Sequence, residues 1–180
     1  MWILLAILAV LALVGIVIYN GLVGKKNQVE NAFASIDAML KKRYDLIPNL
    51  VATVKQYAKH ESDTLVRITE LRARALSPDV SQEERIELDA QVSKAMGGLM
   101  VAVENYPELK ANENFLQMQR ALNEIEEQIS AARRAFNAAV TDYNNAIEMF
   151  PSNIVAGMMN YKRRPLFEIP DTERANVDVG

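Results

Sequence analysis

Residues 25–60 read KKNQVENAFASIDAMLKKRYDLIPNLVATVKQYAKH, and this stretch decides the fold. Apolar side chains recur in it at gaps of three and four, with one skipped turn, which is the spacing of one face of a helix. This stripe comprises Val29, Phe33, Ile36, Leu40, Ile47, Leu50, Val54 and Tyr57. A helix with one apolar face needs a partner surface, and only helical patterns follow along the chain. The sequence therefore predicts an all-α protein in which this stretch is the first of three to four helices in a long antiparallel bundle.

The segment before the stripe has the length and composition of a membrane span. Every residue from Trp2 to Ile18 is apolar or glycine, and about 20 helical residues cross a hydrocarbon core of roughly 30 Å. A cleaved signal peptide is the alternative, but the apolar run is long, no basic residue precedes it and no small-x-small cleavage site follows it. We favour a single-pass anchor over residues 1–24, with the bundle over 25–161 and an extended C-terminal tail over 162–180.

Basic residues near the anchor predict its orientation. Five of them follow the apolar run within about 20 residues, and none precedes it. They are Lys25, Lys26, Lys41, Lys42 and Arg43. Because positive charge is retained on the inner side of a membrane, we expect the bundle to lie in the cytoplasm.

Three residues of the first bundle helix depart from its regular pattern. Arg43 falls on the apolar seam between Leu40 and Ile47, where we favour a side chain that snorkels to water. The alternative is a buried ion pair that fixes register and needs an acidic residue from another helix. Pro48 lacks a backbone N–H and disfavours a helical conformation of the preceding residue, which predicts a kink or a break. Asp45 would then cap a restarted helix.

A helical hairpin is expected after His60. Its first arm carries an apolar face and ends at the Ser77-Pro78-Asp79 turn, and the Ser81 to Glu84 segment has the capping-box pattern of a helix start. On the second arm, Met96 and Met100 form an additional apolar strip beside the main face. Gly97-Gly98 lies inside this arm, where each glycine costs about 1 kcal/mol relative to alanine. Either another backbone approaches closely there or the helix bends.

The longest regular pattern runs from about Asn112 to Pro151, with apolar residues at a period near 3.5. Asn137 and Asn144 flank its aromatic row at a spacing of seven residues. We favour local or solvent-directed hydrogen bonds for these amides, and the alternative is a role in helix register or in a contact between subunits. A short turn or helix is expected after Pro151. Further apolar residues, Leu166, Phe167 and Ile169, are candidates to pin the tail to the bundle.

No residue pattern for catalysis or metal binding is found. His60 is the only histidine, and the zinc-protease motif that His60-Glu61 begins would need a second histidine at position 64, which is Thr64. Cysteine is absent, and the net charge of -3 gives no basic field for nucleic acid. We favour solvated faces for the clustered basic residues Arg133, Arg134, Lys162, Arg163 and Arg164, and the alternative is a patch that binds phosphate or, if the tail folds toward the membrane, lipid headgroups. The sequence predicts no catalytic residue, cofactor, metal or nucleic-acid partner.

Distinctive motifs are spread over nearly the whole chain. They are Tyr19-Asn20, KKRYDLIPNLV at 41–51, TVKQYAKHE at 53–61, YPELKANENFL at 106–116, Arg133-Arg134, Asn137, Tyr143-Asn144, Phe150-Pro151 and Phe167-Glu168. Together they resemble the LemA family of bacterial membrane proteins. Two departures are slight: Phe33 stands where a tryptophan is expected, and Phe136 where a tyrosine is common. The resemblance implies an N-terminal anchor and a long antiparallel helical bundle, and it brings no established catalytic activity.

These observations predict a non-enzymatic membrane protein whose partner is the lipid bilayer. The first hypothesis is a scaffold that forms a homo-oligomer through its bundle and organises or shapes a membrane patch. It is motivated by the anchor, by the strip at Met96 and Met100, and by the missing catalytic pattern. The second hypothesis is an accessory subunit that tethers another membrane protein, such as a peptidase or a sensor.

Overall fold

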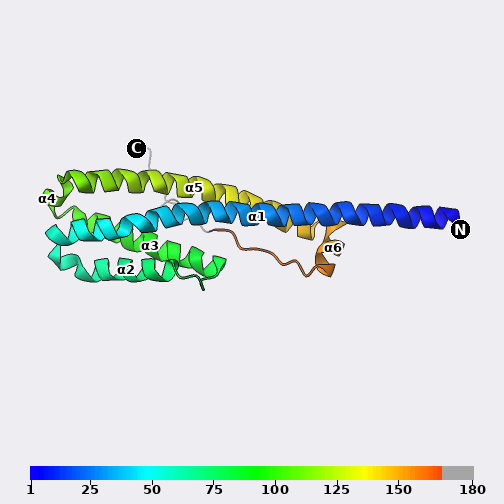
Figure 1. The fold of residues 1–180 in the computed structure, drawn as a ribbon, viewed down its shortest axis with the longest axis horizontal. Helices are drawn as coiled ribbons and strands as arrows, with labels where there is room; N and C mark the ends of the chain where they lie inside the picture. The colour runs from blue at the N-terminus through cyan, green and yellow to red at the C-terminus, as the bar shows by residue number, and fades with distance from the viewer. Residues whose placement is uncertain (168–180) are drawn as a thin grey trace, which may run out of the picture. The chain divides into compact units, whose positions relative to one another are not determined.

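The computed structural model describes residues 1–167, which are almost entirely helical. No strand occurs among these residues, and the predicted all-α fold is confirmed. In chain order the elements are α1 (Trp2–Tyr57), the 3-10 helix η1 (Lys59–Glu61), α2 (Ser62–Ala75), α3 (Gln82–Val103), α4 (Pro107–Lys110), α5 (Glu113–Glu148) and α6 (Ser152–Met158) (Figure 1). They form two units, to both of which α1 and α5 contribute. Unit 1 comprises Met1–Ser35 with Ala132–Phe167, and unit 2 comprises Ile36–Ala131.

Unit 2 is a bundle of α2, α3, α4 and the adjoining parts of α1 and α5. The α1 stripe is buried there from Ile36 to Val54, and Tyr57 is half-buried, whereas Val29 and Phe33 are buried in unit 1. The predicted faces of α2 and α3 are buried as well, at Leu65, Ile68, Leu71, Ala75, Leu88, Val92, Leu99 and Val103. Because burying one such leucine, isoleucine or valine contributes about 1.5–3 kcal/mol, these stripes are the main source of stability in unit 2.

Two predicted helix starts are confirmed in unit 2. The Ser81 hydroxyl accepts a hydrogen bond from the Glu84 N–H at 3.1 Å, which satisfies an amide of the first turn of α3. The Asn112 side-chain oxygen accepts one from the Phe115 N–H at 3.0 Å at the start of α5. The Asn112 amide also donates to the Tyr57 hydroxyl at 3.1 Å, so this cap joins α5 to the end of α1.

The methionine strip and the glycine pair of α3 differ from expectation. Met96 is buried in the core of unit 2 and Met100 is half-buried, so Met96 adds nothing to an exposed strip. A Cβ built at Gly97 or Gly98 meets no atom within 4 Å, so the first of the two alternatives, a close approach of another backbone, is wrong. α3 runs through both glycines without interruption, and both are exposed.

Replacing Gly97 and Gly98 by alanine is expected to stabilise the protein by about 1 kcal/mol at each position. Both residues have helical backbone conformations and open space around the Cβ position, so alanine costs no strain and lowers the entropy of the unfolded chain. Urea unfolding of the full-length protein in detergent, followed by circular dichroism, measures this gain. A loss of stability would show that a partner surface absent from the single chain packs on these glycines.

Unit 1 contains α6, residues 161–167 and the remaining parts of α1 and α5. Two contacts show that α1 and α5 run antiparallel in it. The ring centres of Phe33 and Phe136 lie 5.8 Å apart, and the Lys25 Nζ, earlier on α1, lies 3.9 Å from the carboxylate of Asp142, later on α5. The short helix expected after Pro151 is confirmed as α6. Residues 161–167 are neither helix nor strand, and Phe167 is buried, whereas Leu166 is exposed. Ile169 lies outside the described residues.

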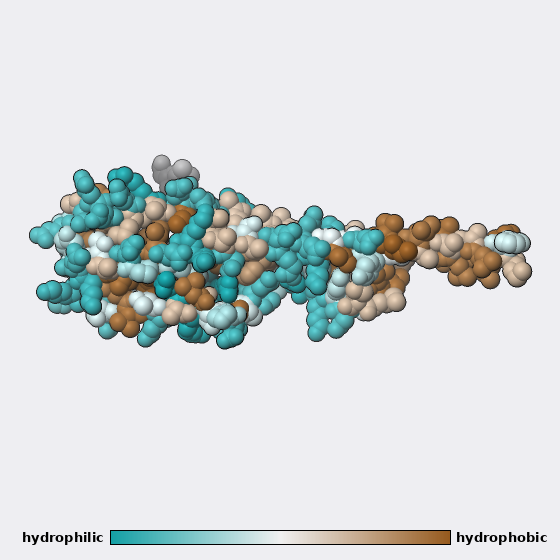
Figure 2. Space-filling model, viewed as in Figure 1, coloured by the Kyte–Doolittle hydropathy of each residue, from teal (hydrophilic) through white to brown (hydrophobic). Residues whose placement is uncertain are grey.

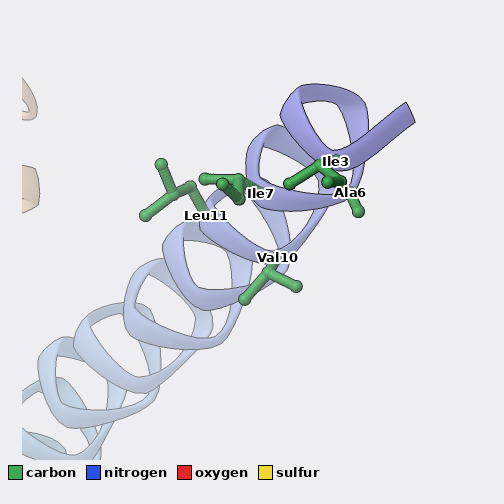
Figure 3. A pocket seen from close by; sticks show the side chains of 5 residues that line it. All are labelled: Ile3, Ala6, Ile7, Val10 and Leu11. Carbon is green, nitrogen blue, oxygen red and sulfur yellow. The ribbon is translucent and has the colours of Figure 1, made fainter. Parts of the chain in front are cut away.

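The N-terminal part of α1 is long and apolar enough to span a membrane, and none of its most apolar stretch is buried in the protein. Figure 2 shows the corresponding apolar surface. A shallow depression on it is lined by Ile3, Ala6, Ile7, Val10 and Leu11 (Figure 3). All five side chains belong to one helix, so the depression is a groove between neighbouring side chains and not an enclosed site. This part of α1 is consistent with the predicted membrane anchor.

Candidate functional site

Arg43 is the centre of a polar cluster inside unit 2. Its side chain is 2% exposed, and Asp89 on α3 is 1% exposed. One guanidinium nitrogen donates to the Ser93 hydroxyl at 3.0 Å and to the Glu126 carboxylate at 2.9 Å, and the other donates to Asp89. Ser93 lies on α3 and Glu126 on α5, so one side chain joins three helices.

The snorkelling arrangement favoured for Arg43 is therefore wrong, and the alternative buried ion pair is present. Arg43 lies between the buried Leu40 and Ile47, and at this seam the neighbouring helices surround the side chain. A buried charge is tolerated only when it is paired and hydrogen-bonded. The sequence does carry a signal for this site. Asp89 and Ser93 are four residues apart, which places both on one helix face beside Leu88 and Val92.

Pro48 does not interrupt α1, and the expected break is wrong. Asp45 consequently lies in the middle of a helical turn, where it is exposed, and it caps no restarted helix. In a regular helix the Tyr44 carbonyl would accept the N–H of residue 48, which proline lacks. Arg72 on α2 donates its Nε–H to that carbonyl at 2.7 Å. A side chain from a neighbouring helix thus replaces the missing backbone donor, and α1 continues.

Replacing Arg72 by methionine is expected to lower the free energy of unfolding by about 1.5–3 kcal/mol, the contribution of a hydrogen bond from a charged donor. In a Pro48→Ala background the same change should cost much less, because the alanine N–H supplies the donor to Tyr44. A double-mutant cycle on the full-length protein measures this coupling. Arg74→Met is the matched control, since Arg74 is exposed and its ion pair with Glu84 is long at 3.9 Å. Equal effects of Arg72→Met in both backgrounds would contradict the replacement.

A second ion pair joins α1 to α3 at the edge of unit 2, between Asp37 and Arg85. Both side chains retain contact with solvent, so this pair is worth less than the buried Arg43 cluster. Asp37 lies six residues before Arg43 on α1, so α3 is held to α1 at two successive levels. Arg43 and Arg85 together fix the register of α3 on α1.

Asn137 and Asn144 bind the backbone of the C-terminal segment, residues 161–167. The Asn137 amide donates to the Phe167 carbonyl at 3.0 Å and its oxygen accepts the Phe167 N–H at 2.8 Å. The Asn144 amide makes the same pair of bonds with Arg164, at 2.9 Å each. The expectation of local or solvent-directed hydrogen bonds is wrong for both residues. Each asparagine side chain bonds both the N–H and the carbonyl of one residue, as a neighbouring β-strand would, and so holds the segment on α5.

The spacing of the two asparagines matches the geometry of the bound segment. Seven helical residues rise about 10.5 Å, and three residues of extended chain span about 10 Å. Asn137 and Asn144 therefore meet Phe167 and Arg164 in register. The Arg164 guanidinium donates to Glu30 on α1 at 2.5 Å, which ties the same segment to the other helix of unit 1.

Aromatic side chains complete this docking. The Phe167 ring lies 6.5 Å from Phe136 in an edge-to-face arrangement, and the buried Arg133 guanidinium lies 5.1 Å from the Phe167 ring centre. The ring centres of Tyr161 and Tyr143 lie 6.1 Å apart. The solvated faces expected for Arg133 and Arg164 are thus wrong, because both arginines hold the segment. Phe167 is confirmed as a residue that pins the tail.

The Tyr143 phenol, which lies beside the docked segment, makes the stability of unit 1 depend on pH. Burial raises its pKa above the ordinary value of 10.0, Arg164 opposes the rise, and Tyr161 and Glu30 add to it. A raised pKa in the folded state gives stability that is present below pH 10 and is lost as the pH rises through the folded-state pKa. We expect the free energy of unfolding to decrease above about pH 10 and this decrease to be smaller in Tyr143→Phe. Urea unfolding at a series of alkaline pH values measures both slopes, and equal slopes would contradict the assignment to Tyr143.

Within residues 1–167, no group of three or more histidine, cysteine, aspartate or glutamate side chains is placed to hold a metal ion. The described residues combine a helical bundle with one N-terminal helix long and apolar enough to cross a membrane. These features define the class as a helical-bundle protein with one helix of membrane-spanning length.

Comparison with known proteins identifies the family. The family model described as LemA family matches residues 32–180, and the chain belongs to the LemA family. It is 30% identical to protein LemA of Metamycoplasma hominis, over 89% of this chain and 73% of that protein. It is 24% identical to magnetosome protein MamQ 2 of Paramagnetospirillum magneticum, over 91% of this chain and 70% of that protein. The resemblance found in the sequence motifs is thus confirmed.

Proposed function

We propose that the protein is a membrane-anchored, non-enzymatic scaffold that assembles with copies of itself to organise or shape a membrane patch. The observation that carries the proposal is the uncovered apolar part of α1, which no other described residue shields from solvent. Such a surface is stable only in lipid or against another apolar surface. The basic residues Lys25 and Lys26 that follow it support an orientation with the bundle in the cytoplasm.

The relatives named as magnetosome proteins also support a role at a particular cellular structure. Those names describe the relatives, and here they support only the broader idea that a LemA-family bundle marks or organises a defined location. No reaction enters the proposal, because the polar clusters at Arg43 and at Asn144 are occupied by contacts within the chain.

A tethering subunit for another membrane protein is the second candidate. It is favoured by one observation: the apolar stripes of unit 2 are covered within a single chain, and Met96 belongs to that core. A bundle that completes its own core needs no second copy, and its outer faces remain available to a different protein. The partner in this case is a membrane protein such as a peptidase or a sensor.

Particle mass and images of the full-length protein, extracted together with its surrounding lipid, distinguish the two candidates. The scaffold predicts a uniform high-order particle that contains one type of chain. A monomer would overturn the scaffold, and a small particle with one further protein would overturn it in favour of the tether. Extraction in lipid is required because detergent can separate contacts between apolar helices.

A further inference from the structure

α6 and the turn before it expose apolar side chains in a pattern opposite to that of a soluble helix. Phe150 is 80% and Met158 is 84% exposed, and Met149 and Ile154 are also exposed. Ile154 and Met158 are four residues apart and share one face of α6, whereas Ala156 on the opposite face is buried. The apolar face of α6 therefore points outward, and the face that contacts unit 1 is the one with the small residue.

The register of unit 1 places this apolar face at the end of the membrane-spanning part of α1. Asp142 pairs with Lys25, and α5 runs antiparallel to α1. Seven residues after Asp142 and just beyond the end of α5, Met149 falls at the level of about Ile18, where the continuous apolar run of α1 ends. On the return path the Tyr161 ring centre lies 5.9 Å from the Lys26 Nζ, so the two ends of the segment that contains α6 lie at these two levels of α1.

Burial along α1 agrees with this placement. Residues 1–14 are exposed all around the helix, whereas Gly15 and Ile18 are half-buried and Leu22 is buried. These three residues are spaced by three and four, so other parts of unit 1 cover one face of α1 only from Gly15 onward. Figure 1 shows α6 beside this part of α1.

We infer that α6 and the turn before it enter the interfacial layer of the bilayer beside the α1 span, with Phe150, Ile154 and Met158 in lipid. A short helix that lies in the membrane plane buries its apolar face about 5–10 Å into the boundary between headgroups and acyl chains. Lys162, exposed just after α6, and Lys25 and Lys26 on α1 supply positive charge for anionic headgroups at the same level. Arg163 is paired with Glu148 at 3.1 Å and Lys25 with Asp142 at 3.9 Å, so these two contribute less than Lys26 and Lys162.

This inference rests on the proposed anchor, and it adds a second membrane contact that fixes how unit 1 stands on the bilayer. A single spanning helix can rotate and tilt freely. A second contact point on the α6 side restricts the tilt, because tilting α1 away from that side would lift Phe150, Ile154 and Met158 into water. Lipid is favoured over a second copy of the chain as the occupant, because the exposed face is continuous in level with the apolar span.

Site-directed spin labelling tests the inference, and the absence of cysteine makes every labelled position unique. Ile154→Cys and Met158→Cys are labelled in the full-length protein, reconstituted in vesicles of phosphatidylcholine and phosphatidylglycerol. Collisions with oxygen report on lipid, and collisions with a water-soluble nickel chelate report on water. Ala138→Cys, at an exposed position of α5 in unit 1, is the matched aqueous control, and Val10→Cys is the lipid control.

The expected result is a ratio of oxygen to nickel accessibility at positions 154 and 158 several-fold above that at position 138. A ratio equal to that at position 138, with position 10 in lipid, would overturn the inference and leave the anchor intact. Labels at 154 and 158 that are shielded from both reagents and broadened by a nearby spin would overturn it in favour of a second copy. A label at position 10 in water would overturn the anchor, and the inference with it.

Discussion

Replacing Arg43 by methionine is expected to lower the free energy of unfolding by about 3–5 kcal/mol, the cost of leaving a buried charge without its partner. Asp89 is almost completely buried, and the Arg43 guanidinium is a charged donor that it contacts. Glu126 loses the same donor but is partly exposed and can be hydrated. Urea unfolding of the full-length protein in detergent, followed by circular dichroism, measures the loss.

Two further variants separate charge from shape at this site. Arg43→Met combined with Asp89→Leu removes both charges and should recover most of the stability, since buried pairs replaced by apolar residues of similar volume are often neutral. Arg43→Lys keeps the charge but lacks the planar fork that reaches Asp89, Ser93 and Glu126 together, so an intermediate loss is expected. A loss below about 1 kcal/mol for Arg43→Met would place the site among ordinary exposed ion pairs and contradict the buried cluster.

Replacing Asn144 by leucine is expected to release Arg164 and the chain around it from α5, at a cost of about 1–3 kcal/mol. Leucine fills a similar space but cannot bind the Arg164 N–H and carbonyl, which would then lie beside an apolar side chain. Asn137→Leu acts in the same way on Phe167, and the double variant should free the whole segment. Hydrogen exchange at the Arg164 and Phe167 amides measures the release directly.

Asn145→Leu is the matched control for this substitution. Asn145 is exposed on the same helix and adjacent to Asn144, so its replacement should leave exchange at Arg164 and Phe167 unchanged. If the Asn144 and Asn137 variants exchange no faster than the control, the segment is held by Phe167, Tyr161 and the Arg164–Glu30 pair without the asparagines. A changed particle size in the double variant would instead indicate that the two asparagines also serve a contact between copies.

Local patterns predicted the elements of this fold well. The α1 stripe, the faces of α2 and α3, the Ser81 cap and the long α5 all follow from periodicity and capping chemistry, which act within a few residues. These features are decided by neighbours in sequence. The first bundle helix and the last one were therefore recognisable without any knowledge of their partners.

The side-chain partners were beyond reach for a physical reason. Whether Arg43 meets water or Asp89 depends on how α3 is shifted along α1, and no pattern within either helix encodes that shift. The continuity of α1 at Pro48 likewise depends on Arg72, 24 positions away in the chain. Asn137 and Asn144 bind backbone groups, which are the same in every residue, so the sequence of the bound segment carries no mark of its partner.

Because Arg72 supplies a donor to α1, the completion of α1 has to follow the synthesis of α2. During synthesis the ribosome delivers Pro48 well before Arg72, so the nascent α1 passes a stage in which the Tyr44 carbonyl can bind only water. At that stage the helix has a weak point at Pro48, nine residues before its end at Tyr57. The arrival of α2 closes the weak point. The Tyr44 carbonyl of α1 thus acquires its donor only when α2 has been made, and a chain truncated before α2 would lack that donor.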